Sequence, residues 1–324
     1  TLNLKHPEGQ AVLHDLVRGA DGVLNNLRGD QPAKLRLTYD DLKAVNPRIV
    51  CVHLSAYGRD GERAAWPGYD YLMQAEAGHL SVTGEPGGPP ARMGLSLVDL
   101  STGLQAAIAM LSGIVEARAT GTGRDLDVSL FDTALSNLCY VGAWYLTAGV
   151  NQGREPRSAH PNLTPSQLYR TRDGWIFIMC NKEKFWAVLA HAVGHPEWAD
   201  DPEFATFADR LRNRDRVTDM LDAALSLRTT EEWLALFGGK VPAAPVNDMK
   251  AALDNPFVRD TGRIVPLAHP SGTDVGTVGP AIRTPGEPPL ANAAPAMGAD
   301  TDAILRGLGY DDARIAALRA QGAV

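Results

Sequence analysis

Cysteine is scarce in this sequence. The 324 residues contain only three cysteines, and Cys51, Cys139 and Cys180 are widely spaced. An odd and scattered set does not form a disulfide framework, and it is typical of proteins in a reducing compartment. We therefore expect a cytoplasmic protein whose cysteines are buried, unreactive and packed like small apolar residues.

An excess of positive charge is also missing. Lysine and arginine number 31 against 38 aspartates and glutamates, so the net charge is -7. Nucleic-acid-binding proteins normally present a basic surface, so we expect no nucleic-acid partner, although a local basic patch for a small anion is compatible with this charge. No uninterrupted apolar run reaches the roughly 18 residues of a membrane span, and we expect no membrane partner.

Several common active-site motifs are absent. His191 and His195 have the spacing of two metal ligands on one helix, but Ala192 stands where a catalytic metal motif carries glutamate. The glycines at 121–124 follow a predicted helix and precede a predicted strand, which is the reverse of a dinucleotide-binding loop. No serine lies in a Gly-x-Ser-x-Gly motif. The sequence therefore predicts neither a metal site nor a serine nucleophile.

Strand-like and helical segments alternate through the first half of the chain. The predicted strands lie at 21–27, 48–58 and 125–130, and the predicted helices at 6–20, 38–47, 69–80, 100–118 and 131–146. In the helix at 100–118 the apolar residues Leu104, Ile108, Leu111 and Val115 recur on one face. This alternation is typical of βαβ units around a parallel sheet, so the predicted fold class is α/β.

The composition changes at 150–166, a polar stretch that contains proline and marks a predicted domain boundary. A β-hairpin with a turn at Asp173 and Gly174 follows, and then helices at 182–193 and 202–237. We predict a large domain at 1–155 and a smaller α+β domain at 156–261. The chain is then expected to return to the large domain at 262–324 and to end in two short helices.

Asp99 stands out because it follows the largely apolar residues 95–98 and precedes a strong helix pattern. Aspartate is a favoured helix N-cap, because its side-chain oxygen accepts unpaired backbone N–H groups. A carboxylate at the N-terminal end of a helix is also kept ionised by the helix dipole, and the N–H groups there can stabilise an oxyanion. Such a carboxylate can form covalent acyl intermediates. From the residues alone both interpretations remain open.

Several stretches, taken in order, resemble the family III CoA-transferases. This family contains formyl-CoA:oxalate and carnitine CoA-transferases and the α-methylacyl-CoA racemases. The stretches that carry the resemblance are TLNLKHPEG at 1–9, LNNLRGDQPAKLRLTYDDLKAVNPRIV at 24–50, PGYDYLMQAEAGHLSVTG at 67–84, VDLSTGLQAAIAMLSGIVEARATGTGRDLDVSLFD at 98–132, PAAPVND at 242–248 and GADTDAILRGLGYDDARIAALRAQGAV at 298–324.

The resemblance implies chemistry on a CoA thioester. Asp99 takes the position of the family's nucleophile, which attacks an acyl-CoA and forms a mixed anhydride and then an aspartyl-CoA thioester. CoA and acyl-CoA are implied as substrates, with a small carboxylic acid as acceptor and no permanently bound cofactor. The residues implied to bind CoA or to line its site are Leu2, Lys5, Asn26, Leu27, Arg28, Lys34, Leu35, Tyr69 and Asp70. Among these, Lys34 takes the family's phosphate-contacting position and Leu35 lies beside the adenine.

One departure from the family separates two activities. Tyr69 stands where the racemases carry the histidine that moves the α-proton. Proton abstraction needs a base that ionises near the working pH, whereas a phenol ionises only around pH 10. The resemblance therefore favours CoA transfer, with acyl-CoA racemisation or epimerisation as the alternative.

A second departure concerns the length of the chain, because members of the family carry a further segment ahead of TLNL. The other alternative is thus a catalytically silent, truncated homologue. The resemblance also implies a Rossmann-like large domain built from both chain ends, a smaller α+β domain and an interlocked homodimer.

Overall fold

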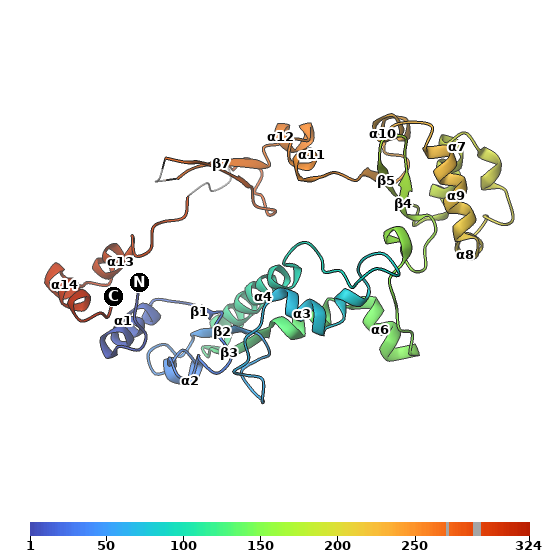
Figure 1. Ribbon diagram of the computed structural model, residues 1–324. Helices are drawn as coiled ribbons and strands as arrows, with labels where there is room; N and C mark the ends of the chain where they lie inside the picture. Colours follow the sequence, from blue (N-terminus) through green and yellow to red (C-terminus); the bar gives the residue numbers. More distant parts are fainter. Residues whose placement is uncertain (270–271, 288–292) are drawn as a thin grey trace. The chain divides into compact units, whose positions relative to one another are not determined.

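The computed structural model describes residues 1–269, 272–287 and 293–324. The chain divides into two compact units, which are described separately below (Figure 1). The first unit contains residues 1–83, 89–153 and 295–324, and the second contains residues 84–88 and 154–294. Both ends of the chain therefore belong to the first unit.

The first unit is built on a parallel three-stranded sheet in the order β1–β2–β3. The strands are β1 (Gly22–Asn25), β2 (Val50–Ser55) and β3 (Arg124–Ser129). Strand β2 is central, and its residues 50–53 are fully buried. The α/β class and the parallel sheet predicted from the alternating segments are confirmed.

The helices of the first unit follow the predicted order. They are α1 (Pro7–Arg18), α2 (Tyr39–Leu42), α3 (Asp70–Glu76), the 3-10 turn η1 (His79–Ser81), α4 (Leu97–Thr120), α5 (Leu130–Ser136), α6 (Cys139–Ala148), α13 (Thr301–Gly307) and α14 (Asp312–Ala320). The two C-terminal helices lie beside α1, where Leu305, Ile315 and Leu318 pack against Val12 (Figure 1). The predicted single helix at 131–146 is two helices.

Helix α4 packs on the sheet through its small residues. Ala106, Gly113 and Ala117 are buried against this surface, and a Cβ added at Gly113 would lie 2.7 Å from Cγ1 of Val50. Small side chains let the helix approach the strands closely, so glycine at 113 has a packing reason.

The opposite face of α4 carries the large apolar residues. Leu100, Leu104, Ile108, Leu111 and Val115, here called the α4 apolar stripe, are each 58% to 69% exposed. Of the helices in the described residues, α4 alone is long and apolar enough to cross a membrane, by length and composition only. Core helices of soluble proteins also pass this test, and the absence of a membrane partner stays a prediction.

The second unit has an antiparallel sheet covered by helices. Its first sheet has the order β4–β5–β6, with strands β4 (Ser166–Arg170), β5 (Trp175–Met179) and β6 (Ala243–Pro245). A separate two-stranded sheet joins β7 (Ile264–Ala268) to β8 (Asp274–Val278). The helical elements are η2 (Pro156–Ser158), α7 (Glu183–Ala192), η3 (Pro196–Ala199), α8 (Phe207–Arg212), α9 (Arg214–Leu225), α10 (Thr230–Phe237), α11 (Met249–Leu253) and α12 (Pro256–Asp260).

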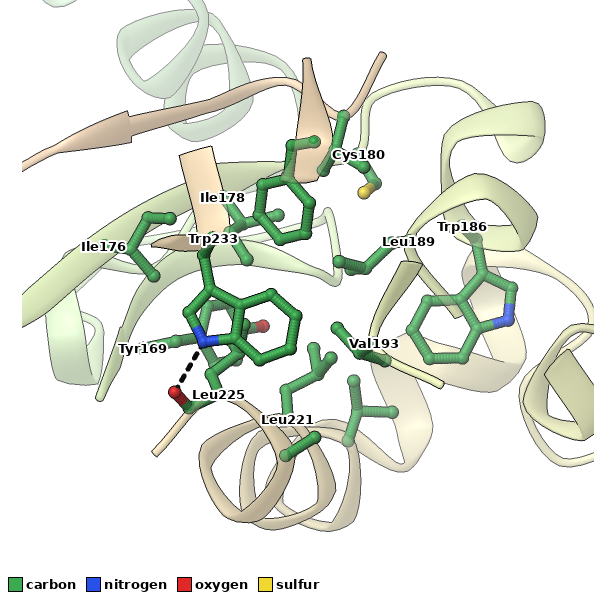
Figure 2. Close-up of a cluster of buried hydrophobic side chains, with 14 of the residues drawn as sticks. Tyr169, Ile176, Ile178, Cys180, Trp186, Leu189, Val193, Leu221, Leu225 and Trp233 are labelled. Atoms are coloured by element: carbon green, nitrogen blue, oxygen red, sulfur yellow. Dashed lines mark hydrogen bonds between the residues drawn. The ribbon is translucent and has the colours of Figure 1, made fainter. Parts of the chain in front are cut away.

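The predicted hairpin forms from β4 and β5, and Arg170 pairs with Trp175 at its end. Figure 2 shows the core beneath it, where aromatic rings and aliphatic side chains from the sheet meet those of α7, α9 and α10. The indole N–H of Trp233 donates to the carbonyl of Leu225 at 2.7 Å, so this large ring is buried without an unpaired polar atom.

The boundaries of the units can be compared with the predicted domains. The first unit gives way to the second between Gly153 and Arg154, close to the predicted boundary at 155. Residues 262–294 group with the second unit, so the chain returns to the first unit at Pro295 rather than at 262. The three-part domain division stays a prediction.

The cysteines differ in their surroundings. Cys51 and Cys180 are buried as expected, and burial raises the pKa of each thiol to about 12. Cys139 is exposed, so the expectation that all three are buried was wrong. It lies where α5 and α6 separate, with a φ of 49° that takes it out of a continuous helix.

Candidate active site

A cavity of about 460 Å³ opens at the carboxyl ends of the three parallel strands. Asn26 follows β1 within one residue, Ser55 ends β2, and Leu130 comes directly after β3. Ligands of open α/β sheets bind at this edge, because the loops that leave the strands converge there. The full lining is Asn26, Leu27, Arg28, Leu54, Ser55, Ala56, Trp66, Gly68, Tyr69, Asp99 and Leu130.

The cavity brings together part of the predicted site. Asp99 shares it with Asn26, Leu27, Arg28 and Tyr69, so three separate segments of the chain meet there. Tyr69 is 70% exposed, so its ring is open to a ligand. The predicted nucleophile and four of the predicted binding residues thus line one cavity.

Asp99 is the third residue of α4, and the N-cap is Ser96. The N-cap interpretation of Asp99 was therefore wrong, because the helix begins at Leu97, three residues before the predicted start at 100. Within the described residues the Asp99 carboxylate accepts no hydrogen bond, and the residue is exposed on the cavity wall. An unpaired carboxylate on a cavity is free to attack a ligand.

The backbone N–H groups of this helix turn are largely used. The N–H of Leu97 donates to the carbonyl of Leu95, and the N–H of Leu100 donates to the carbonyl of Ser96. The N–H of Asp99 donates to Oδ2 of Asp70 at 3.0 Å. These three donors are therefore not available to an oxyanion, contrary to the expectation from the sequence.

Desolvation and the charge of Asp70 together raise the pKa of Asp99 above that of an ordinary aspartate. Burial disfavours the charged form of a carboxyl group, and a nearby negative charge disfavours it further. A carboxylate with a raised pKa is more basic, and hence a better nucleophile once it is ionised.

Asp70 lies behind the cavity rather than on its wall. Its side chain is 4% exposed, and the residue is absent from the lining. Oδ1 of Asp70 accepts a hydrogen bond from Nε2 of Gln74 at 2.5 Å, while Oδ2 accepts the N–H of Asp99. Asp70 therefore contacts the predicted nucleophile from the protein interior.

The remaining predicted CoA residues lie outside this cavity. Leu2 and Leu35 are half-buried and pack against the apolar cluster under α1, whereas Lys5 is exposed. Lys34 is exposed, and its ammonium lies 2.6 Å from Oδ2 of Asp30. The structure therefore places Leu2, Lys5, Lys34 and Leu35 away from the cavity lining, and their contacts with CoA stay predictions.

Asp30 holds two of the predicted phosphate-binding cations near the cavity. Its carboxylate pairs with Lys34 and also with Nε of Arg28 at 3.3 Å. The hydrogen bond from Lys34 holds the pKa of Asp30 below its usual value. An incoming phosphate would thus find two cations that already share one carboxylate, and it would compete with that carboxylate for them.

Trp66 lines the cavity and was not predicted. Its indole is 47% exposed, and the guanidinium of Arg63 lies 4.8 Å from its ring centroid. The sequence predicts neither a strand nor a helix at 59–68, between the strand at 48–58 and the helix at 69–80. The signal that was overlooked is its position directly after a parallel strand, since such loops line ligand sites.

The chain is similar to known proteins over most or all of its length. The model of CoA-transferase family III matches residues 1–301. An acyl-CoA transferase of Fusarium pseudograminearum is 35% identical over all of this chain and 72% of its own length. The human succinyl-CoA:glutarate CoA-transferase is 29% identical over all of this chain and 74% of its own length.

A solved structure shares the fold. The crystal structure of a CAIB/BAIF family protein from Brucella suis superposes with a TM-score of 0.78 at 30% sequence identity. The match covers 95% of this chain and 80% of that one.

Proposed function

The chain belongs to CoA-transferase family III, and from that premise we propose that it moves CoA from an acyl-CoA to a small carboxylic acid through a covalent intermediate on Asp99. The observation that carries this proposal is the carboxylate of Asp99, which has no hydrogen-bond partner among the described residues and lies on the wall of a cavity shared with Asn26, Leu27 and Arg28. A carboxylate and a thioester are close in energy, so the exchange is reversible and needs no external energy source.

The reaction proceeds by four acyl transfers. The Asp99 carboxylate attacks the thioester carbonyl, the C–S bond breaks, and CoA leaves as thiolate while a mixed anhydride forms. The thiolate then attacks the Asp99 carbonyl of the anhydride, which releases the donor acid as carboxylate and leaves an aspartyl-CoA thioester. The acceptor carboxylate attacks this thioester, and the thiolate returned by that step attacks the acceptor carbonyl. Asp99 is regenerated as a carboxylate, and no proton is consumed.

The surrounding residues have separate roles in this proposal. Arg28 and Lys34 bind CoA phosphates in exchange for their contacts with Asp30. Leu2, Lys5 and Leu35 extend the CoA site beyond the cavity, as the resemblance implies. Tyr69 lies on the cavity wall, and its phenol stands where the racemases carry a histidine. A phenol is a poor base for proton abstraction, which supports transfer over racemisation.

Trapping of the intermediate tests the proposal. The chain is incubated with succinyl-CoA, the donor named for the human relative, and then with hydroxylamine or borohydride. We expect an aspartyl hydroxamate, or the reduced residue, on the peptide that contains Asp99, and none with Asp99→Ala. Succinyl-CoA consumption without any mark on Asp99 would contradict the covalent route. Exchange of the α-proton of an acyl-CoA for deuterium, without CoA transfer, would instead indicate the racemase.

We also propose that the protein is a homodimer. The α4 apolar stripe exposes five large apolar side chains on one helix. Contiguous apolar surface of this kind is rare on monomers and commonly marks an interface. The family resemblance implies a homodimer, so we expect a second copy of the chain to cover the stripe.

A further inference from the structure

Gln74 is a polar side chain in an apolar place. It lies on α3 next to the fully buried Met73, and only 1% of its surface is exposed. A buried amide is costly unless its donors and acceptor are paired. Its hydrogen bonds therefore show what this residue does.

The partners of Gln74 in the described residues lie just before α4 or contact its first turn. Its Nε2 donates to Oδ1 of Asp70 at 2.5 Å and to the carbonyl of Leu95 at 3.3 Å. Its Oε1 accepts the backbone N–H of Met93 at 3.0 Å. One side chain thus ties α3 to both sides of residue 94, just before Ser96 caps α4.

Asp70 extends this connection to the predicted nucleophile. Its Oδ1 is held by Gln74, and this leaves Oδ2 facing the N–H of Asp99 at 3.0 Å. Asp70 is 4% exposed, so its two oxygens depend on these protein donors rather than on water. The result is a continuous chain of hydrogen bonds from Met93 through Gln74 and Asp70 to Asp99.

We propose that Gln74 is a positioning residue for Asp99, which it aligns with the cavity by holding Asp70 and the segment 93–95. This inference rests on the proposed function, in which Asp99 attacks a thioester. Gln74 is absent from the cavity lining, so it acts through Asp70 and not on the ligand. A displacement of about 1 Å at a reacting group can lower a rate about 100-fold, so this arrangement matters for kcat.

The polarity of the Asp70–Gln74 pair allows a sharp test. In Gln74→Glu, a second carboxylate faces Oδ1 of Asp70 in place of the amide donor. In Asp70→Asn, the group that faces Nε2 of Gln74 is either an amide N–H₂ or an uncharged oxygen. The double variant Asp70→Asn with Gln74→Glu reverses the pair: the Asn amide donates to the new Glu, its oxygen still accepts the N–H of Asp99, and Glu accepts the N–H of Met93. The hydrogen bonds to Asp99 and Met93 are restored with the charge moved to position 74, whereas the 3.3 Å donation to the carbonyl of Leu95 is lost.

The assay uses succinyl-CoA as donor and glutarate as acceptor. We expect each single variant to lose about 10- to 100-fold in kcat with little change in KM for succinyl-CoA, and the double variant to recover at least about tenfold. Leu72→Ala, on the same helix and 53% exposed, is the matched control and should retain wild-type kcat. Singles that match wild type, a double no better than the singles, or a change confined to KM would each overturn the proposal.

A measurement that does not need activity separates this proposal from the proposed function. Gln74→Met is close in volume and removes the hydrogen bonds, so backbone amide exchange over 93–99 should accelerate relative to wild type and to Leu72→Ala. Unchanged exchange would overturn the positioning role. If wild type transfers no CoA but backbone amide exchange over 93–99 accelerates in Gln74→Met, the proposed function fails and the connection from Gln74 to Asp99 stands.

Discussion

Oδ2 of the buried Asp70 accepts the backbone N–H of Asp99 at 3.0 Å. This contact places a negative charge behind the predicted nucleophile and takes up the backbone N–H of Asp99. The charge contributes, after desolvation, to the raised pKa of Asp99. Asp70 thus affects both where Asp99 lies and how basic its carboxylate is.

The first prediction concerns pH. Asp99 must be ionised to attack, so kcat/KM rises with pH through the pKa of Asp99. Because the Asp70 charge raises that pKa, Asp70→Asn lowers it, and the acidic limb of the profile moves to lower pH. The measurement is kcat/KM for succinyl-CoA against pH for wild type and Asp70→Asn. A limb that stays in place or moves upward would contradict the electrostatic role of Asp70.

The second prediction separates activity from stability at Asp99. Asp99→Ala should lower kcat by at least about 10³-fold, because the nucleophile is lost. The free energy of unfolding should stay within about 0.5 kcal/mol of wild type, because the exposed carboxylate has no hydrogen-bond partner in the described residues. Denaturant unfolding and steady-state kinetics check the two parts. A variant that unfolds much more easily would show that Asp99 is mainly structural.

The third prediction concerns the CoA phosphates. Lys34→Ala should raise KM for succinyl-CoA about tenfold, the effect of losing about 1.5 kcal/mol from one charge-assisted contact, with kcat little changed. Lys43→Ala is the matched control, since Lys43 is exposed and pairs with Asp40 at 2.6 Å, as Lys34 does with Asp30. Equal effects of the two substitutions would argue against a phosphate contact by Lys34.

The fourth prediction compares two glycines of α4. A Cβ at Gly113 would lie 2.7 Å from Val50 and 2.9 Å from Leu126, so Gly113→Ala should destabilise the fold by about 1–3 kcal/mol. A Cβ at Gly103 meets nothing within 4 Å, so Gly103→Ala should stabilise it by about 1 kcal/mol through helix propensity. Thermal or denaturant unfolding gives both values, and equal signs would contradict the packing described for α4.

The fifth prediction tests the homodimer. Replacing both Leu104 and Leu111 by Glu puts charge into the α4 apolar stripe and should convert a dimer into a monomer in light scattering. Leu227→Glu is the control, because Leu227 is 72% exposed in the second unit and outside the stripe. A wild-type monomer, or a dimer that survives the double substitution, would rule out this interface.

The sequence by itself determined the order of most elements of the first unit and the type of its sheet, although not every helix boundary. Alternating apolar segments predicted β1, β2 and β3, and the 3.6-residue repeat predicted α4, because these periodicities are local. The motif stretches also brought Asp99, Asn26, Leu27, Arg28 and Tyr69 into one hypothesis, and these residues line one cavity.

Only the tertiary structure decided which faces are buried and which polar groups meet. The period of α4 marks an apolar face, yet the sheet receives Ala106, Gly113 and Ala117, because close packing favours the small side of the helix. Asp70 and Asp99 are 29 residues apart, and their contact depends on how α3 meets α4. Burial and hydrogen-bond partners arise from elements that are distant in the chain, so no local pattern contains them.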